Sequence, residues 1–185
     1  MPMPSMTKFP ETLPEIQAGM DASMAAAEQL AAEATEPLFH SRPNGKWSIG
    51  ENLEHLILSN MGVASALARP KAFFEQFGAP QGPSRTYQAM HDQYFVLVQG
   101  RTAPPPFAPD REAPTSQADL LHSWRTIRAK YAERLPAHWT EETLDQYCLP
   151  HPAIGQLTVR EMLFFHIFHN HHHLAAMERI VKGTA

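Results

Sequence analysis

Apolar residues recur every three or four positions over four long segments of the chain, which is the periodicity of an amphipathic α-helix. These segments cover about residues 13–36, 49–68, 117–135 and 159–182. Pro37, Pro70 and Pro136 follow the first three segments, where a proline ends or kinks a helix. The pattern therefore predicts four long helices.

Three of the segments begin with a capping box, in which a hydroxyl residue and an acidic residue three positions later satisfy each other's free backbone N–H groups. The three pairs are Thr12 with Glu15, Ser48 with Glu51, and Thr158 with Glu161. The remaining segment follows Ser116, which is a favourable N-cap on its own. A further short helix is predicted over residues 87–98, where apolar residues have mixed spacing.

The connections between the helices complete the predicted fold. Residues 99–115 contain Pro104-Pro-Pro and predict a long extended connection, of a length that is often functional. Residues 150–156 predict a turn, and residues 1–11 an N-terminal extension. We therefore expect residues 1–185 to form one all-α domain, a four-helix bundle with a long crossover connection between the second and third main helices.

Composition narrows the class of protein. A net charge of −4 over 185 residues argues against a nucleic-acid partner, which would need a basic face. The single cysteine, Cys148, excludes an internal disulfide and fits a reducing compartment. No run has the length of a membrane span, and the N-terminus lacks the apolar region of a signal peptide. We expect a soluble cytoplasmic protein with no membrane partner.

Histidines supply the candidate chemistry of the final helix. His166, His169 and His173 share one face of it, together with Met162 and Met177, because their spacings are three or four. His169 and His173 lie one turn apart, so their rings can converge as two metal ligands from one helix. The alternative is a histidine-rich amphipathic helix whose polar core residues only pack.

His55 stands apart on the second helix. It lies roughly 130° from the centre of that helix's apolar stripe, with small or polar neighbours such as Asn52, Ser59 and Gly62. Either His55 faces solvent or it lines a polar cavity. Five other histidines are expected at the surface: His40, His91, His122, His138 and His151.

Two stretches resemble the helix signatures of the DinB-like superfamily, which includes DinB and YfiT-like proteins. The first is Trp47-Ser-Ile-Gly-Glu-Asn-Leu-Glu-His55-Leu. The second is His151-Pro-Ala-Ile-Gly-Gln-Leu-Thr, followed by Phe165-His-Ile-Phe-His169-Asn-His-His-His173-Leu. Their order and separation also agree, so the resemblance covers nearly the whole chain.

The resemblance implies a four-helix bundle with a long crossover, often dimeric, and a metal site with one histidine from the second helix and two from the last. Carried over to this chain, the ligands are His55, His169 and His173. His166 departs from the minimal pattern. It is expected either as a hydrogen-bonded residue beside the site or as a fourth ligand that closes it.

Three imidazoles suit Zn²⁺, our first choice, and also Ni²⁺ or Fe²⁺, and three ligands leave positions open for water or substrate. The resemblance implies a metal-dependent enzyme, with thiol transfer from a low-molecular-weight thiol ahead of hydrolysis of a small-molecule substrate. A non-catalytic metal- or small-ligand-binding stress protein is the alternative. The catalytic residues stay unknown: Glu51, Glu54 and Asp119 are candidate bases, although Glu51 is better explained as a cap.

The segment Met162–Phe168 is apolar on every side. Such a helix is buried all round, so it needs either a covering segment or a subunit interface. We expect a homodimer.

Overall fold

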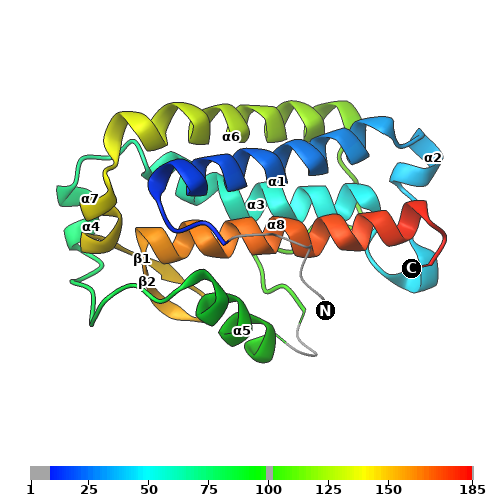
Figure 1. Cartoon of the computed structure of the whole chain (residues 1–185). Coiled ribbons are helices and arrows are strands. Elements are labelled where there is room, and N and C mark those ends of the chain that lie inside the picture. Colours follow the sequence, from blue (N-terminus) through cyan, green and yellow to red (C-terminus); the bar gives the residue numbers. More distant parts are fainter. Residues whose placement is uncertain (1–8, 99–101, 185) are drawn as a thin grey trace.

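Four long helices pack side by side along most of their length (Figure 1). They are α1 (Leu13–Glu33), α3 (Ile49–Ala66), α6 (Gln117–His138) and α8 (Val159–Val181). This computed structural model describes residues 9–98 and 102–184, so most of the predicted extension 1–11 and part of the connection 99–115 lie outside it. The predicted helical bundle with a long crossover between its second and third main helices is confirmed.

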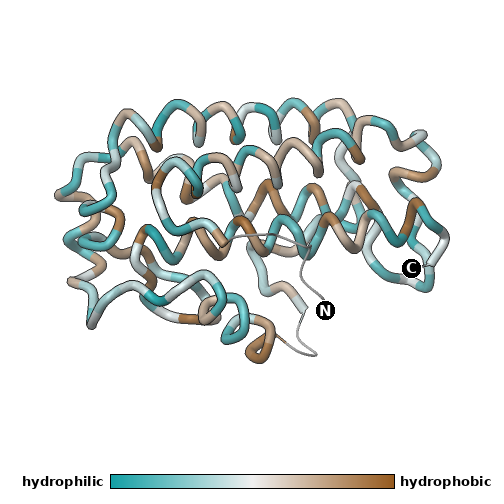
Figure 2. Tube along the Cα trace, in the orientation of Figure 1, coloured by the Kyte–Doolittle hydropathy of each residue, from teal (hydrophilic) through white to brown (hydrophobic). Residues whose placement is uncertain are grey.

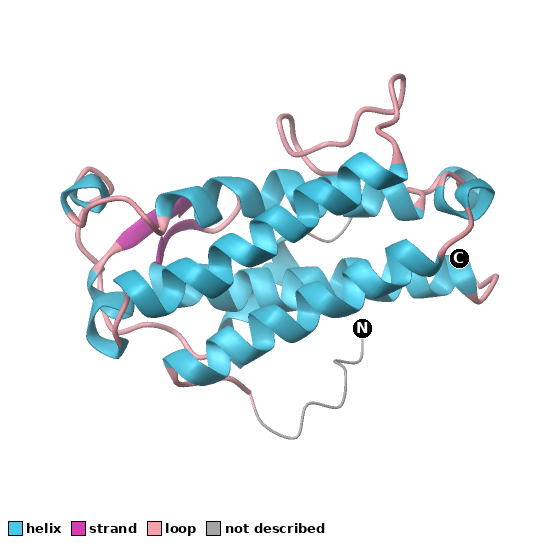
Figure 3. Cartoon of the chain, turned by 90° about the horizontal axis from the view of Figure 1, so that it is seen from above, coloured by secondary structure: helices cyan, strands magenta, loops and turns pink. Residues whose placement is uncertain are grey.

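Short elements join the long helices. They are α2 (Glu36–Phe39), the 3₁₀ turn η1 (Pro43–Gly45), α4 (Ala72–Glu75), α5 (Tyr87–Leu97), α7 (Glu141–Gln146), β1 (Cys148–His151) and β2 (Gly155–Thr158). The hairpin lies at one end of the bundle in both views of the chain (Figures 1 and 3). None of the helices in the described part of the chain is long and apolar enough to cross a membrane.

The helix starts agree with the local signals in the sequence. All three predicted capping boxes form, at Thr12, Ser48 and Thr158, with both hydrogen bonds of each box present. Ser116 caps α6, since its hydroxyl accepts from the N–H of Asp119. These starts need only neighbouring residues, which explains why the sequence predicts them.

One predicted break in the chain is wrong, and one predicted turn is confirmed as part of a hairpin. Helix α6 continues through Pro136 to His138, because the buried Trp139 anchors its end by donating its indole N–H to the Leu67 carbonyl at 2.9 Å. The predicted turn at 150–156 is the tip of an antiparallel hairpin, in which His151 pairs with Gly155. Gly155 has a positive φ of 87°, which suits a tight reversal.

Helix α8 is the central element of the core. Apolar and polar residues alternate along each long helix (Figure 2), yet Glu161 to Asn170 of α8 are all buried. Helix α5 covers the face that the sequence left unpartnered: Tyr94 packs against Phe165 and Phe168, with ring centroids 5.1 and 5.6 Å apart. The covering segment thus comes from the chain itself, and the homodimer stays a prediction.

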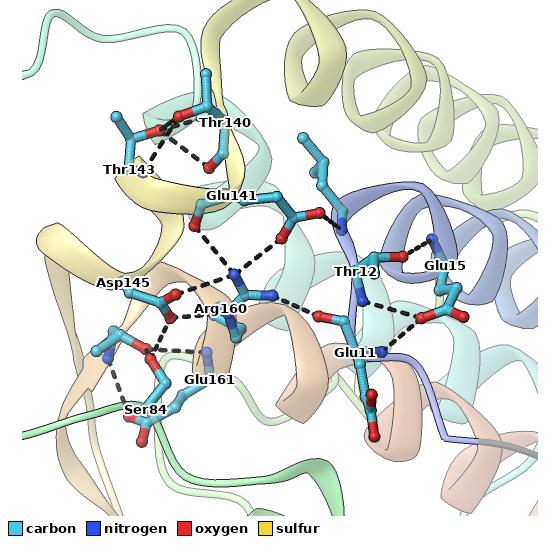
Figure 4. A network of polar contacts seen from close by, with 12 residues as sticks. Glu11, Thr12, Glu15, Ser84, Thr140, Glu141, Thr143, Asp145, Arg160 and Glu161 are labelled. Carbon is cyan, nitrogen blue, oxygen red and sulfur yellow. Dashed lines mark hydrogen bonds and ion pairs between the residues drawn. The ribbon is translucent and has the colours of Figure 1, made fainter.

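A polar network anchors the first turn of α8 (Figure 4). Arg160 donates to the Asp145 carboxylate at 2.7 and 3.0 Å and to the Glu141 carboxylate at 3.0 Å. The buried Glu161 carboxylate accepts from the side chain of Arg85 at 2.8 and 3.0 Å. These contacts tie α7 and the segment before α5 to the start of the helix that carries the histidines.

Candidate metal centre

Three histidines converge between α3 and α8. His55 comes from α3, and His169 and His173 come from consecutive turns of α8. One ring nitrogen from each lies within 4.8 Å of the other two, and the side chains are 6%, 2% and 8% exposed. In the described part of the chain, these three form the group of potential ligands that could hold an ion. His55 therefore faces the interior and not solvent.

The protonation of His55 follows from its outer partner. Its Nδ1 lies 2.7 Å from the main-chain oxygen of Phe107, in the long crossover connection. A carbonyl oxygen can only accept, so Nδ1 carries the proton and Nε2 of the neutral ring presents a lone pair. That Nε2 lies 3.1 Å from Nε2 of His169.

His173 is held in the same way by a side chain. Its Nδ1 lies 2.8 Å from Oδ1 of Asn52, whose amide nitrogen donates to the Ser48 carbonyl at 2.8 Å. This second bond assigns the orientation of the Asn52 amide, so its oxygen accepts from His173. His173 therefore also presents a lone pair on Nε2.

Electrostatics favour neutral rings throughout the cluster. Burial lowers the pKa of His55, and burial together with the neighbouring imidazoles lowers the pKa of His169 and His173 well below the ordinary value. Neutral imidazole is the form that binds metals. Two lone pairs that converge in a buried cluster are both satisfied by a cation, so the residues fit a divalent metal ion with three nitrogen ligands.

Aromatic rings surround the three imidazoles. The Trp47 ring, just before the α3 cap, lies 5.0 Å from that of His55 and 5.9 Å from that of His173. Phe165 stacks on His169 at 4.8 Å, and the Tyr94 ring lies perpendicular to the same imidazole at 5.9 Å. A ligand bound here would lie in largely apolar surroundings.

His166 is placed beside the cluster and outside it. Its ring nitrogens are not among the group of atoms that lie within 4.8 Å of one another. The side chain is 1% exposed, and neither ring nitrogen has a hydrogen-bond partner among the described residues. Burial lowers the pKa of His166 to about 3, so the ring is neutral.

The three candidate bases have separate environments. Glu51 is buried and accepts from Ser48, Arg42 and Arg111, so its carboxylate is engaged in structure. Asp119 is exposed at the start of α6. Glu54 lines a cavity of about 160 Å³ beside the first turns of α3, and burial raises its pKa. None of them belongs to the cluster of three histidines.

Sequence reasoning missed several residues around the site. Asn52 counted only as a small polar neighbour of His55, and Phe107 acts through a main-chain atom that carries no sequence signal. His151 was expected at the surface but is buried, and burial lowers its pKa to about 4. The one available signal was the position of Asn52, one turn into a capped helix and one turn before His55.

Comparison with known proteins identifies the family and the fold. Residues 19–177 match the model of the DinB superfamily. The fold resembles TT2238, described as a four-helix bundle protein, with a TM-score of 0.57 and 18% identity over 90% of this chain and 98% of that one. It also resembles YfiT from Bacillus subtilis, described as a probable metal-dependent hydrolase with an unusual four-helix bundle topology.

For YfiT the TM-score is 0.59 and the identity 16%, over 99% of this chain and 92% of that one. At such identities the two likenesses show a common fold. No protein with a curated functional description matches the sequence. Because the family model spans most of the chain, the protein belongs to the DinB superfamily.

Proposed function

We propose that the protein is a divalent-metal-dependent enzyme in which His55, His169 and His173 hold the ion. The observation that carries this proposal is the pair of outward hydrogen bonds from the Nδ1 atoms of His55 and His173. Those bonds leave the Nε2 atoms of His55 and His173 without a proton, and one ring nitrogen from each of the three histidines lies within 4.8 Å of the other two. Zinc is the preferred ion, and nickel or iron would suit the same three nitrogens.

The residues around the site have distinct roles in this proposal. A divalent ion held there would act as a Lewis acid, which lowers the pKa of a coordinated water or thiol toward neutrality. The three imidazoles bind it, while Phe107 and Asn52 orient two of those rings. Trp47, Phe165 and Tyr94 exclude bulk water, which strengthens electrostatic interactions within the site.

We favour transfer of a low-molecular-weight thiol to an electrophilic small molecule. The resemblance to the DinB-like superfamily suggests this reaction. The thiol has to come from outside the chain, because the single cysteine, Cys148, is 2% exposed and burial raises its pKa. Hydrolysis is the second candidate, favoured by the description of YfiT as a probable metal-dependent hydrolase.

A non-catalytic metal- or small-ligand-binding stress protein is the competing class. The low exposure of the three rings favours it, because a ligand has little direct access to them.

We also propose that the protein acts in the cytoplasm, as a homodimer. Light scattering at micromolar concentration tests the assembly, and a monomer would reject it.

The first test is the metal content of the untagged protein, measured by mass spectrometry. We expect about one equivalent of zinc, nickel or iron in the parent, lost in a His169→Ala, His173→Ala double variant. A panel of thiols with electrophiles, and of esters, then tests turnover. Metal without turnover would support the binding protein. No metal in the parent, even after incubation with Zn²⁺ and desalting, would reject the metal site.

A further inference from the structure

Two buried asparagines of α3 are similar in their backbone contacts and differ in what their side-chain oxygens face. Asn52 donates its amide N–H to the Ser48 carbonyl at 2.8 Å, and Asn60 donates to the Leu56 carbonyl at 2.9 Å. Both bonds reach four residues back, and the side chains are 3% and 0% exposed. The Asn52 oxygen accepts from a metal-ligand candidate, whereas the Asn60 oxygen has no partner among the described residues.

We infer that Asn52 is a positioning residue that sets the metal affinity of the site through His173. Rotating its amide by 180° would place the side-chain oxygen against the Ser48 carbonyl and the amide N–H groups against the Nδ1 proton of His173. Both contacts would be repulsive, so one orientation is fixed. The fixed oxygen then holds the His173 ring in one tautomer and one plane, with Nε2 directed at the other two ligands.

The capping box of α3 positions Asn52 for its contact with His173. Ser48 and Glu51 fix the first turn, and the Ser48 carbonyl accepts both the main-chain N–H of Asn52, at 3.0 Å, and its side-chain amide. A second, weaker contact joins the amide to the Trp47 carbonyl at 3.4 Å. The start of the helix therefore aims Asn52 at His173, 121 residues later in the chain.

His55 receives its acceptor from the crossover connection, as the main-chain oxygen of Phe107. No side-chain substitution removes that main-chain oxygen. Of the two acceptors that orient the histidines, only Asn52 can therefore be tested by mutation. Residues that orient metal-bound histidines typically contribute 10- to 100-fold to metal affinity, so a loss of about that size is expected without Asn52. This inference rests on the proposed metal site and adds a residue that touches neither metal nor substrate.

The test compares Asn52→Leu with Asn60→Leu as a matched control. Each substitution removes one buried amide of α3 and its bond to the carbonyl four residues earlier, and Asn60→Leu also removes the bond of the Asn60 amide to Oδ1 of Asn170 on α8, at 3.2 Å. The probe is Co²⁺ alone, followed by its visible absorption spectrum and by titration, with the melting temperature of the metal-free protein recorded in parallel. We expect Asn52→Leu to bind Co²⁺ about 10- to 100-fold more weakly, with a changed spectrum. Asn60→Leu should keep the parent's affinity and spectrum despite a lower melting temperature.

Asn52→Asp keeps an acceptor opposite His173 but places its second oxygen beside the Ser48 carbonyl, so it should recover part of the lost affinity. Asn52→Ala replaces the leucine variant if that variant does not fold. Equal Co²⁺ affinity in the parent and Asn52→Leu would overturn the inference while leaving the metal site intact. An equal loss in Asn60→Leu would show a general effect of stability and overturn it too. A parent that binds neither Co²⁺ nor Zn²⁺ would reject the proposed function itself.

Discussion

Helix α8 carries two sets of buried polar groups that differ in where their hydrogen bonds go. At its first turn, both oxygens of the Glu161 carboxylate accept hydrogen bonds from the side chain of Arg85. Two to three turns later, His169 and His173 meet His55 with their Nε2 atoms directed at one another. In the first set, both carboxylate oxygens of Glu161 have hydrogen-bond donors from the protein itself. In the second, His55 and His173 have outer partners for their Nδ1 atoms, whereas the Nδ1 atom of His169 has no partner among the described residues.

This difference separates structure from function. A buried polar group without a partner costs free energy, so native proteins satisfy nearly all of them. Around Glu161 the partners are the protein's own. Around the three histidines, two outward bonds fix the rings and leave inward lone pairs that a cation would satisfy. The contrast can be tested by removing one group at a time from each set.

The largest effect is expected for His55→Ala. This variant removes the ligand that α3 supplies and leaves two nitrogens on α8, so metal affinity should fall by at least ~100-fold, more than the loss of an orienting residue. Competition with a colorimetric chelator measures it. The metal-free variant should also melt at a lower temperature, because it lacks a buried ring and its hydrogen bond to the Phe107 carbonyl. Metal affinity equal to that of the parent would show that His55 does not bind the ion.

Arg85→Met should instead affect stability alone. It leaves the buried Glu161 carboxylate without its cationic partner, which costs 3–5 kcal/mol for a fully buried pair. Because Arg85 is 34% exposed, we expect a smaller loss of about 2 kcal/mol in the free energy of unfolding. Urea unfolding at pH 7 measures it, with metal content as the control. A loss of metal in this variant would contradict the separation of the two sets.

His166→Phe tests whether His166 belongs to the metal site or only contributes to stability. Burial lowers the pKa of His166 from 6.5 to about 3 in the folded protein. As the pH falls below 6.5, the unfolded chain takes up a proton at His166 that the folded protein does not, so the free energy of unfolding decreases until the pH reaches about 3. At pH 5.5 this one group should destabilise the metal-free parent by about 1.4 kcal/mol relative to neutral pH. Denaturant unfolding at pH 7.5 and 5.5 should show a flatter pH dependence in the variant.

The same His166 variant should retain its metal, because the structure places that ring outside the cluster. Loss of metal would identify His166 as a fourth ligand. An unchanged pH dependence would mean that its ring is protonated equally in the folded and unfolded chain.

The smallest effect is expected for Glu141→Gln, at the exposed edge of the polar network. The Glu141 side chain is 52% exposed, and its ion pair with Arg160 is therefore screened by water. We expect a change of less than about 0.5 kcal/mol in the free energy of unfolding. Thermal melting at low and high salt measures it. A larger loss would place Glu141 among the essential parts of the network.

Local chemistry explains which parts of this protein the sequence predicts well. The helix starts at Ser48 and Thr158 depend on residues three positions away, and the one-turn spacing of His169 and His173 depends only on helix geometry. The break predicted at Pro136 fails because a distant contact, from Trp139 to the Leu67 carbonyl, holds the helix end. The hairpin at Cys148–Thr158 was missed because its two strands have only four residues each, too few for a period to be read.

By itself, then, the sequence determined the four long helices, their caps and the pair of histidines on one face of the last helix. Only the tertiary structure decided that His55 faces inward, that the Phe107 carbonyl and Asn52 orient two rings, and that α5 covers the apolar side of α8. The physical reason is separation along the chain. His55 meets His169 across 114 residues and Phe107 across 52, and such contacts depend on how whole helices pack. The periodicity and caps of a single helix do not predict such long-range contacts.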